Sequence, residues 1–356
     1  MDSLSLLIDI EKVFPDFELS VKLECEDEIL ALLGSSGCGK SLTLKCIAGI
    51  EKPDRGRIII NGETVFDSEK GVNLPPQKRH VGFLFQNYAL FPTMTVRQNI
   101  YSVIKKPKAD SAAIVDDLLK KFQLELVKDL LPRQISGGQQ QRVALSRMLA
   151  SEPKIVLLDE PFSALDTHLR WQVEQEVSSV LADFGGTTIL VSHDRSEAYR
   201  FSDKIAVMDC GKIRSIGRKE DIFGIPKSLA VALLTGLKNI SGARKIDDHT
   251  VMAEDWGVTL KSGEIVSDNV KYVAIRAHSF EHSFRERSYG ENVFKCRVSK
   301  VIDELFETTV EFTFDSVIQQ DKTLCFATAK NRFDSGADMD MLYVHIPPDK
   351  VFCLDE

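Results

Sequence analysis

ILALLGSSGCGKSLTLKCIAG, residues 29–49, decides the fold of the N-terminal half of the chain. The stretch begins with an uninterrupted apolar run, continues through a glycine-rich loop and ends in a helical pattern. An apolar run without alternation is typical of a strand that is buried on both faces of a parallel sheet. The sequence therefore predicts a strand, a tight loop and a helix in direct succession.

The loop GSSGCGKS, residues 34–41, fits the pattern of a phosphate-binding loop. Its glycines let backbone N–H groups point at phosphate oxygens, and the helix that follows adds the positive end of its dipole. Lys40 is expected to contact the β- and γ-phosphates, and the Ser41 hydroxyl to bind Mg²⁺. A chance glycine-rich turn is the alternative, but the flanking strand and helix argue against it. The residues expected to bind the nucleotide are Gly34, Ser35, Ser36, Gly37, Cys38, Gly39, Lys40, Ser41 and Leu42.

A second apolar run, KIVLLDEPFSALD at residues 154–166, ends in two acids. Ligands bind at the carboxyl ends of strands in open parallel sheets, where Asp159 and Glu160 are placed. Asp159 is expected to hold Mg²⁺, and Glu160 to polarise the attacking water as general base. A surface acid pair is the alternative reading of this segment taken alone.

Two further polar residues follow apolar strands. His193 in LVSHD and Gln86 in FLFQN are predicted at the same sheet edge. We expect His193 to contact the γ-phosphate, and Gln86 to contact both the metal and the attacking water. A lone histidine is more often structural, and Gln86 read alone fits a strand-end surface residue.

Organisation along the chain indicates an α/β domain over residues 1–236 and an all-β domain over residues 237–356. The runs at 154–159, 187–192 and 204–209 resemble the strand at 29–34, and a helical stripe extends from Leu165 to Phe184. Strands give way to helical patterns between about 97 and 150, which predicts a helical subdomain. The later segments are short, β-branched and roughly alternating, which favours a small barrel of the OB type.

Composition excludes several functions. The chain has 356 residues and a formal net charge of −8, which argues against a nucleic-acid partner. Seven cysteines without a CxxC pair indicate neither a zinc site nor a redox motif, and suit a reducing cytosol. The N-terminus lacks the features of a signal peptide, and the apolar runs are too short to cross a bilayer.

One remaining stretch, ISGGQQQR at residues 135–142, looks like an anion site without a lysine. With the four stretches above, it makes residues 4–235 resemble the ATP-binding subunit of an ABC transporter. The resemblance implies a head-to-tail homodimer with ATP and Mg²⁺ as cofactors, in which this stretch caps the γ-phosphate bound to the partner subunit. Ser136 is a natural N-cap for that helix. The capping residues implied are Ser136, Gly137, Gly138 and Gln139.

Two departures from the family pattern concern this half of the chain. Ile135 replaces the usual leucine, which is a conservative change. The stretch ECEDEILALL lacks a glycine usual before the core strand, so the aromatic residue that stacks on adenine is harder to place. Phe14 is the choice and Phe17 the alternative, and either one fits a core position. Cys38 precedes a helix start, which is expected to lower the pKa of its thiol if the thiol is exposed.

Within this family, the chain most resembles an importer ATPase. The resemblance implies a location at the cytoplasmic face of the membrane, integral permease subunits as partners and an upstream substrate-binding protein. Tyr88, Leu90, Phe91 and Met94 would receive the permease, although packing inside the domain is equally compatible with them. Segments of the β domain look most like the molybdate, tungstate and sulfate branch. Importers of sugar, polyamine or iron, or a soluble ATPase, are the alternatives. The β domain would bind the oxyanion and inhibit hydrolysis, or serve only for dimerisation.

Overall fold

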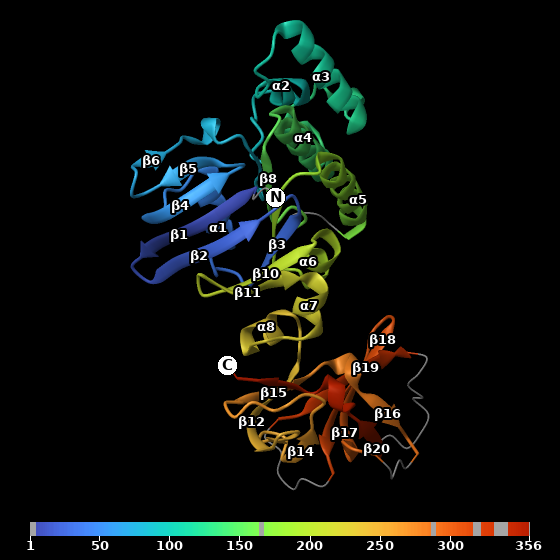
Figure 1. Cartoon of the computed structure of the whole chain (residues 1–356). Helices are drawn as coiled ribbons and strands as arrows, with labels where there is room; N and C mark the ends of the chain where they lie inside the picture. The colour runs from blue at the N-terminus through green and yellow to red at the C-terminus, as the bar shows by residue number, and fades with distance from the viewer. Residues whose placement is uncertain (1–4, 164–166, 286–289, 316–321, 331–340, 356) are drawn as a thin grey trace. The chain divides into compact units, whose positions relative to one another are not determined.

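The computed structural model describes residues 5–163, 167–285, 290–315, 322–330 and 341–355 (Figure 1). Its contacts divide the chain into two compact units, Met1–Lys219 and Glu220–Glu356. This division lies before the predicted boundary at residue 236. Ala232 and Leu237 pack with Ala274 and Leu354, so the segment around helix α8 (Leu229–Leu234) joins the core of the second unit.

An eleven-stranded sheet forms the centre of the first unit. Five of its strands are parallel neighbours in the order β10, β3, β9, β8 and β7. Every residue of β8 and β9 is buried, which confirms the parallel sheet predicted from the apolar runs. The bounds of these strands are β3 Ile29–Leu33, β7 Val81–Leu84, β8 Ile155–Asp159, β9 Thr188–Ser192 and β10 Lys204–Asp209.

The other six strands of this sheet were not recognised in the sequence. They pair mainly antiparallel, and β2 alternates buried and exposed residues because one of its faces is covered. Their bounds are β1 Leu6–Phe14, β2 Phe17–Cys25, β4 Arg55–Ile60, β5 Glu63–Asp67, β6 Val72–Asn73 and β11 Lys212–Arg218.

Helices of the first unit include the predicted helical subdomain. Figure 1 shows α2 and α3 beside α4, and Val96, Val115 and Val143 from the three helices share one buried cluster. Gly185 ends α5 in a left-handed conformation, with φ of 62°; Leu165 lies outside the described residues. The helix bounds are α1 Lys40–Ala48, α2 Val96–Tyr101, α3 Lys108–Lys121, α4 Gly137–Ala150, α5 Thr167–Phe184 and α6 Arg195–Phe201.

The second unit is built on two five-stranded sheets, in the orders β14-β13-β12-β15-β21 and β16-β20-β17-β18-β19. Their core contains Trp256, Phe312 and Phe326, all fully buried. Two antiparallel sheets confirm the predicted all-β domain, and the OB assignment stays a prediction. The strands are β12 Asn239–Asp247, β13 Thr250–Ala253, β14 Val258–Lys261, β15 Tyr272–Ile275, β16 Glu281–Ser283, β17 Val293–Asp303, β18 Glu307–Phe314, β19 Leu324–Ala329, β20 Met341–His345 and β21 Phe352–Leu354.

Candidate nucleotide-binding site

The phosphate loop lies between the end of β3 and the start of α1, as its sequence predicts. Gly37 and Gly39 are left-handed, with φ of 82° and 108°. A methyl group at Gly34 would lie 2.3 Å from the carbonyl oxygen of Met208, so only glycine fits there. Ser35 and Ser36 are exposed, whereas Leu42 is half-buried against the core.

Lys40 is held inside this loop. Its side chain is 5% exposed, and Nζ donates to the carbonyl oxygens of Gly34 at 2.7 Å and Ser35 at 2.8 Å. A buried ammonium needs such acceptors to offset its lost hydration. The arrangement fixes a positive charge where the loop amides and the helix N-terminus also favour an anion.

Ser41 and Asp159 meet across the sheet edge. The Ser41 hydroxyl donates to Oδ1 of Asp159 at 2.6 Å. Asp159 is 7% exposed, and this burial raises the pKa of its carboxyl, although the hydrogen bond from Ser41 opposes the change. Mg²⁺ takes oxygen ligands and uses one or two carboxylates together with phosphates and water. These two side chains therefore fit a Mg²⁺ site, as the sequence indicated.

Glu160 brings the other predicted catalytic residues together. His193 Nδ1 lies 3.2 Å from Oε1 of Glu160, and Gln86 Nε2 donates to Oε2 at 3.3 Å. Gln86 Nε2 also donates to the Ser163 hydroxyl at 3.3 Å. Glu160 itself has φ of 46°, an uncommon left-handed conformation for a non-glycine residue. The carboxylate is thus held between two polar side chains from neighbouring strands.

An ion-pair network that sequence reasoning missed supports the loop of His193. Arg170 on α5 pairs with Asp194 at 2.9 Å, with Glu174 at 3.3 Å and with Glu197. The Ser192 hydroxyl donates to Glu197 Oε2 at 2.6 Å. Burial has the largest effect on Glu197 and raises the pKa of its carboxyl. The hydrogen bond from Ser192 and the charge of Arg170 act in the opposite direction.

The sequence did carry a signal for part of this network. Asp194 is the N-cap of α6, and its side chain accepts hydrogen bonds from the backbone N–H groups of Ser196 and Glu197. The pattern DRSE at residues 194–197 has an N-cap acid followed three residues later by glutamate, which is typical of a helix start. Arg170, which is 24 positions before Asp194 in the chain, has no comparable local signal.

A cavity of about 540 Å³ opens beside the phosphate loop, and Phe17 and Gly37 both line it. Phe14 is not among the described lining residues; its side chain is 38% exposed, with the Lys12 ammonium 5.1 Å from the ring centroid. Phe17, the alternative, therefore lines this cavity, while the assignment of Phe14 as the stacking residue stays a prediction.

The thiol of Cys38 is buried, and its pKa changes in the direction opposite to that expected for an exposed thiol. Its side chain is 4% exposed, and burial raises the pKa of the thiol, although Lys40 nearby opposes this effect. A lowered pKa requires an exposed thiol at the helix start. The condition of exposure is not met, because Cys38 lies within the core cluster, and the pKa of its thiol is raised instead of lowered.

Ser136 caps α4 as predicted. Its hydroxyl accepts from the backbone N–H of Gln139 at 3.3 Å, and Gln139 Oε1 accepts from the backbone N–H of Ser136 at 2.9 Å. This reciprocal capping box leaves Ser136 and Gly137 exposed at the helix start, while Gly138 is buried. Within the described part of this single chain, neither Ser136 nor Gly137 hydrogen-bonds to the phosphate loop.

Of the proposed permease-contacting residues, the structure buries one. Tyr88 is 7% exposed and lies in the core of the helical subdomain, whereas Phe91 is 44% exposed and Leu90 and Met94 are half-buried. None of the helices that the structure describes is both long and apolar enough to span a membrane.

Comparison with known proteins identifies similar chains. The sequence profile of the family described as "ABC transporter" matches residues 18–163. The spermidine/putrescine import ATP-binding protein PotA of Nitratidesulfovibrio vulgaris is 43% identical over 252 residues, covering 68% of this chain and 67% of that protein. The Fe(3+) ions import ATP-binding protein FbpC 2 of Haemophilus influenzae is 37% identical over 281 residues, covering 78% and 77%.

The similar solved structures are also ATP-binding cassettes or parts of ABC transporters. The dimeric post-hydrolysis state of the ATP-binding cassette MJ0796, bound to ADP and Pi, aligns with a TM-score of 0.52 and 27% identity, covering 61% of this chain and 99% of that one. The structure of cbiO1 from Clostridium perfringens, part of the ABC transporter complex cbiONQ, aligns with a TM-score of 0.54 and 28% identity, covering 63% and 92%.

Proposed function

The chain belongs to the ABC transporter family as the ATP-binding subunit of an importer, and we propose that it hydrolyses ATP with Glu160 as general base. The observation that carries this proposal is the Glu160 carboxylate, which contacts both Gln86 and His193 at the sheet edge next to the phosphate loop. Phosphate release by the full-length chain, measured with ATP and Mg²⁺, tests it. Tight ATP binding without any phosphate release overturns it.

The side chains of the site have separate roles in this proposal. Lys40 and the loop amides bind phosphate oxygens, and Phe17 lies where a base can stack. Ser41 and Asp159 would hold Mg²⁺, which neutralises charge on the phosphates. Glu160 takes the proton from a water molecule, and Gln86 and His193 orient its carboxylate toward that water.

We also propose that two copies complete each site. Ser136 and Gly137 are exposed at the N-terminus of α4, where a helix dipole favours an anion. The family resemblance implies that this helix start binds the nucleotide held by a second subunit, and the exposure of Ser136 and Gly137 is compatible with that role. The similar MJ0796 cassette is dimeric in its solved structure. Light scattering with and without ATP tests the homodimer.

For transport, we propose a peripheral subunit at the cytoplasmic face of the membrane that works with permease subunits and a substrate-binding protein. The similar import proteins named above are described as spermidine/putrescine and Fe(3+) importers. These names favour a polyamine, with iron as the second candidate, over the molybdate, tungstate or sulfate expected from the β domain. Uptake of labelled spermidine, Fe³⁺ and molybdate by cells with and without the gene separates these substrates.

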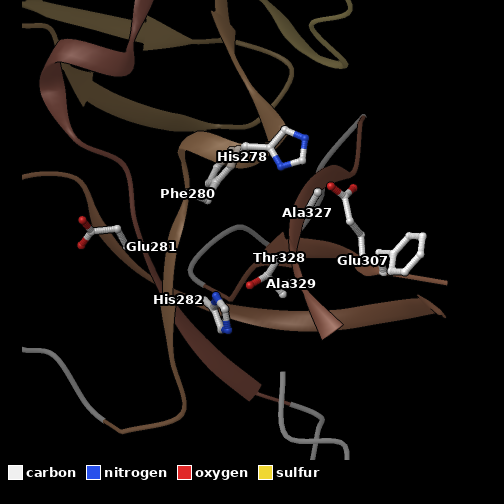
Figure 2. Close-up of a pocket in the computed structure, with 9 residues that line it drawn as sticks. His278, Phe280, Glu281, His282, Glu307, Ala327, Thr328 and Ala329 are labelled. Atoms are coloured by element: carbon white, nitrogen blue, oxygen red, sulfur yellow. The ribbon is translucent and has the colours of Figure 1, made fainter. Parts of the chain in front are cut away.

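The second unit contains a cavity, whose lining residues Figure 2 shows. A cavity of about 870 Å³ there is lined by His278, Phe280, Glu281, His282, Phe306, Glu307, Ala327, Thr328 and Ala329. The described lining contains two carboxylates, two histidines and neither lysine nor arginine. Oε2 of Glu281 also lies 3.1 Å from Nδ1 of His345. An oxyanion site needs cationic or clustered N–H donors, so this cavity suits a cation better.

The segments KNISGAR, residues 238–244, and AIRAH, residues 274–278, carry donor types suited to an oxyanion. Two of these donors already have partners in the structure. Arg276 donates to the carbonyl oxygens of Phe223 and Thr235. The amide of Asn239 is buried and donates to Ile275 and Cys325. We therefore propose that the second unit regulates hydrolysis by binding the imported cation in this cavity, and that it contributes to dimerisation.

A further inference from the structure

Gln141 is a fully buried polar residue in the apolar interior of the helical subdomain. It lies on α4, is 0% exposed, and is followed by the buried residues Val143, Ala144 and Leu145. Burying an amide is costly unless its donor and acceptor both have partners. A leucine or methionine would fill such a position without that requirement, so the partners of this amide are informative.

Both ends of the Gln141 amide are used, and they reach two different loops. Nε2 donates to the carbonyl oxygen of Pro161 at 2.9 Å, and Oε1 accepts from the Tyr88 hydroxyl at 3.2 Å. The orientation of the amide is determined, because a carbonyl oxygen only accepts hydrogen bonds. Gln141 therefore links the residue after Glu160 to a residue two positions after Gln86.

The two loops that Gln141 links are unusual in backbone conformation. Tyr88, Ala89 and Glu160 are left-handed, with φ of 60°, 43° and 46°. Such conformations in non-glycine residues persist where surrounding contacts fix them. Arg147, also on α4, donates to the carbonyl oxygens of Tyr88 at 2.9 Å and Ala89 at 2.8 Å. Helix α4 thus holds one loop through Arg147 and joins it to the other through Gln141.

We propose that Gln141 is a positioning residue that, through Tyr88 and the Pro161 carbonyl, sets the placement of Glu160 against Gln86. This proposal rests on the proposed role of Glu160 as general base. The helix that carries Gln141 begins at Ser136, so nucleotide contact at that end acts on the same rigid element that holds both catalytic loops. The link thereby couples the helix start to the geometry of the hydrolytic site.

The test compares Tyr88→Phe, Gln141→Met and the double variant in the full-length chain. Tyr88→Phe removes only the hydroxyl, and Gln141→Met preserves length without hydrogen bonds. We expect each single variant to lower kcat for ATP about tenfold while KM changes less than about twofold. The double variant is expected to lose no more than the worse single variant, because all three cut one chain of contacts. Tyr101→Phe, at an exposed position on α2, is the matched control.

Several outcomes overturn the link. Unchanged kcat in a folded Tyr88→Phe variant, losses that add in the double variant, or an equal loss in Tyr101→Phe each contradict it. If Gln141→Met does not fold, the kcat of Tyr88→Phe still tests the link, because that variant keeps the aromatic ring and loses only the hydroxyl. A Glu160→Gln variant measured in parallel separates the two proposals: wild-type hydrolysis in that variant defeats the general-base assignment, whereas a Tyr88→Phe result defeats only the link.

Discussion

The hydroxyl of Ser41 lies 2.6 Å from Oδ1 of Asp159, to which it donates a hydrogen bond, although the two residues are 118 positions apart. This contact joins the first turn of α1 to the end of β8. In the absence of a metal, the hydroxyl is one of the few groups that compensate a nearly buried carboxylate. Burial of this carboxylate is therefore expected to cost the metal-free protein stability, a cost that Mg²⁺ bound in the proposed site would offset.

Asp159→Asn is expected to lower Mg²⁺-dependent hydrolysis about a hundredfold or more, because the carboxylate ligand is lost. The same change is expected to stabilise the metal-free protein at pH 7, since Asn keeps an acceptor for Ser41 but carries no charge. Burial raises the pKa of Asp159 in the folded state. Protonation of Asp159 therefore favours folding. The destabilisation that the ionised carboxylate causes decreases as pH falls, and it is gone once pH is below the pKa of Asp159 in the unfolded chain.

Urea unfolding in EDTA at pH 7 and pH 4 measures this effect. The free energy of unfolding of Asp159→Asn is expected to exceed that of wild type by less at pH 4 than at pH 7. An advantage that grows on acidification contradicts the direction of the pKa change. Asp129→Asn, at an exposed position, serves as the control for a generic change of charge.

Glu160→Gln is expected to abolish hydrolysis while preserving ATP binding, and to trap a dimer. The amide keeps the shape of the side chain but cannot accept a proton from water. Gel filtration with ATP and Mg²⁺ is expected to show the dimer, and Glu125→Gln, at an exposed position, is expected to behave as wild type. A monomeric variant with ordinary turnover at saturating ATP contradicts the role of Glu160.

The parts of the site that could be predicted were those with a local sequence signal. The glycine-rich loop, the acids after β8 and the cap at Ser136 each depend on residues that adjoin in the chain. The antiparallel strands β1, β2 and β4 were missed because their one-sided alternation is weaker than the continuous apolar runs of the buried strands.

Burial and long-range pairing could not be read from the sequence. The exposure of Cys38 could not be judged from its position at a helix start, because the core that covers this residue comes from distant segments. Arg170 and Asp194 likewise pair across 24 positions, and no periodicity reports such contacts. Sequence order also offered little ground for choosing Phe14 over Phe17, because both adjoin the turn between β1 and β2. Their exposure and their relation to the cavity differ only in the structure.

Cysteine labelling tests the corrected view of Cys38. We expect iodoacetamide at pH 7.5 (a value on the order of one unit below a free thiol pKa) to modify the exposed Cys210 well before the buried Cys38. Burial keeps the Cys38 thiol protonated and inaccessible. Peptide mass mapping of the time course locates the label, and Cys210→Ser is expected to remove the fast phase. Rapid labelling of Cys38 in that variant contradicts the burial of its thiol.

Arg170→Met is expected to lower the free energy of unfolding by about 3 kcal/mol at pH 7, because the buried Glu197 loses the cation with which it pairs, whereas Glu174 keeps Arg200 at 2.9 Å. Arg170 lowers the pKa of Glu197, so its removal raises that pKa further. Protonation of Glu197 then relieves part of the penalty, and the loss is expected to be smaller at pH 5 than at pH 7. Urea unfolding at both pH values measures this, with the exposed Arg218→Met as control. If Arg170→Met and Arg218→Met lower the free energy of unfolding equally, or if the loss in Arg170→Met is larger at pH 5, the ion-pair network is not its cause.

The cavity of the second unit leads to a prediction about ligand charge. We expect isothermal titration of the full-length chain to detect spermidine or putrescine, and to detect neither molybdate nor sulfate, because the described lining holds two carboxylates and neither lysine nor arginine. Glu307→Gln is expected to weaken amine binding about tenfold, while Glu291→Gln, outside the described lining, leaves it unchanged. The amine is also expected to inhibit ATP hydrolysis in wild type and to inhibit it less in Glu307→Gln. Oxyanion binding that survives Glu307→Gln contradicts the cation assignment, and amine binding without any effect on hydrolysis contradicts the regulatory role while leaving the cavity as a binding site.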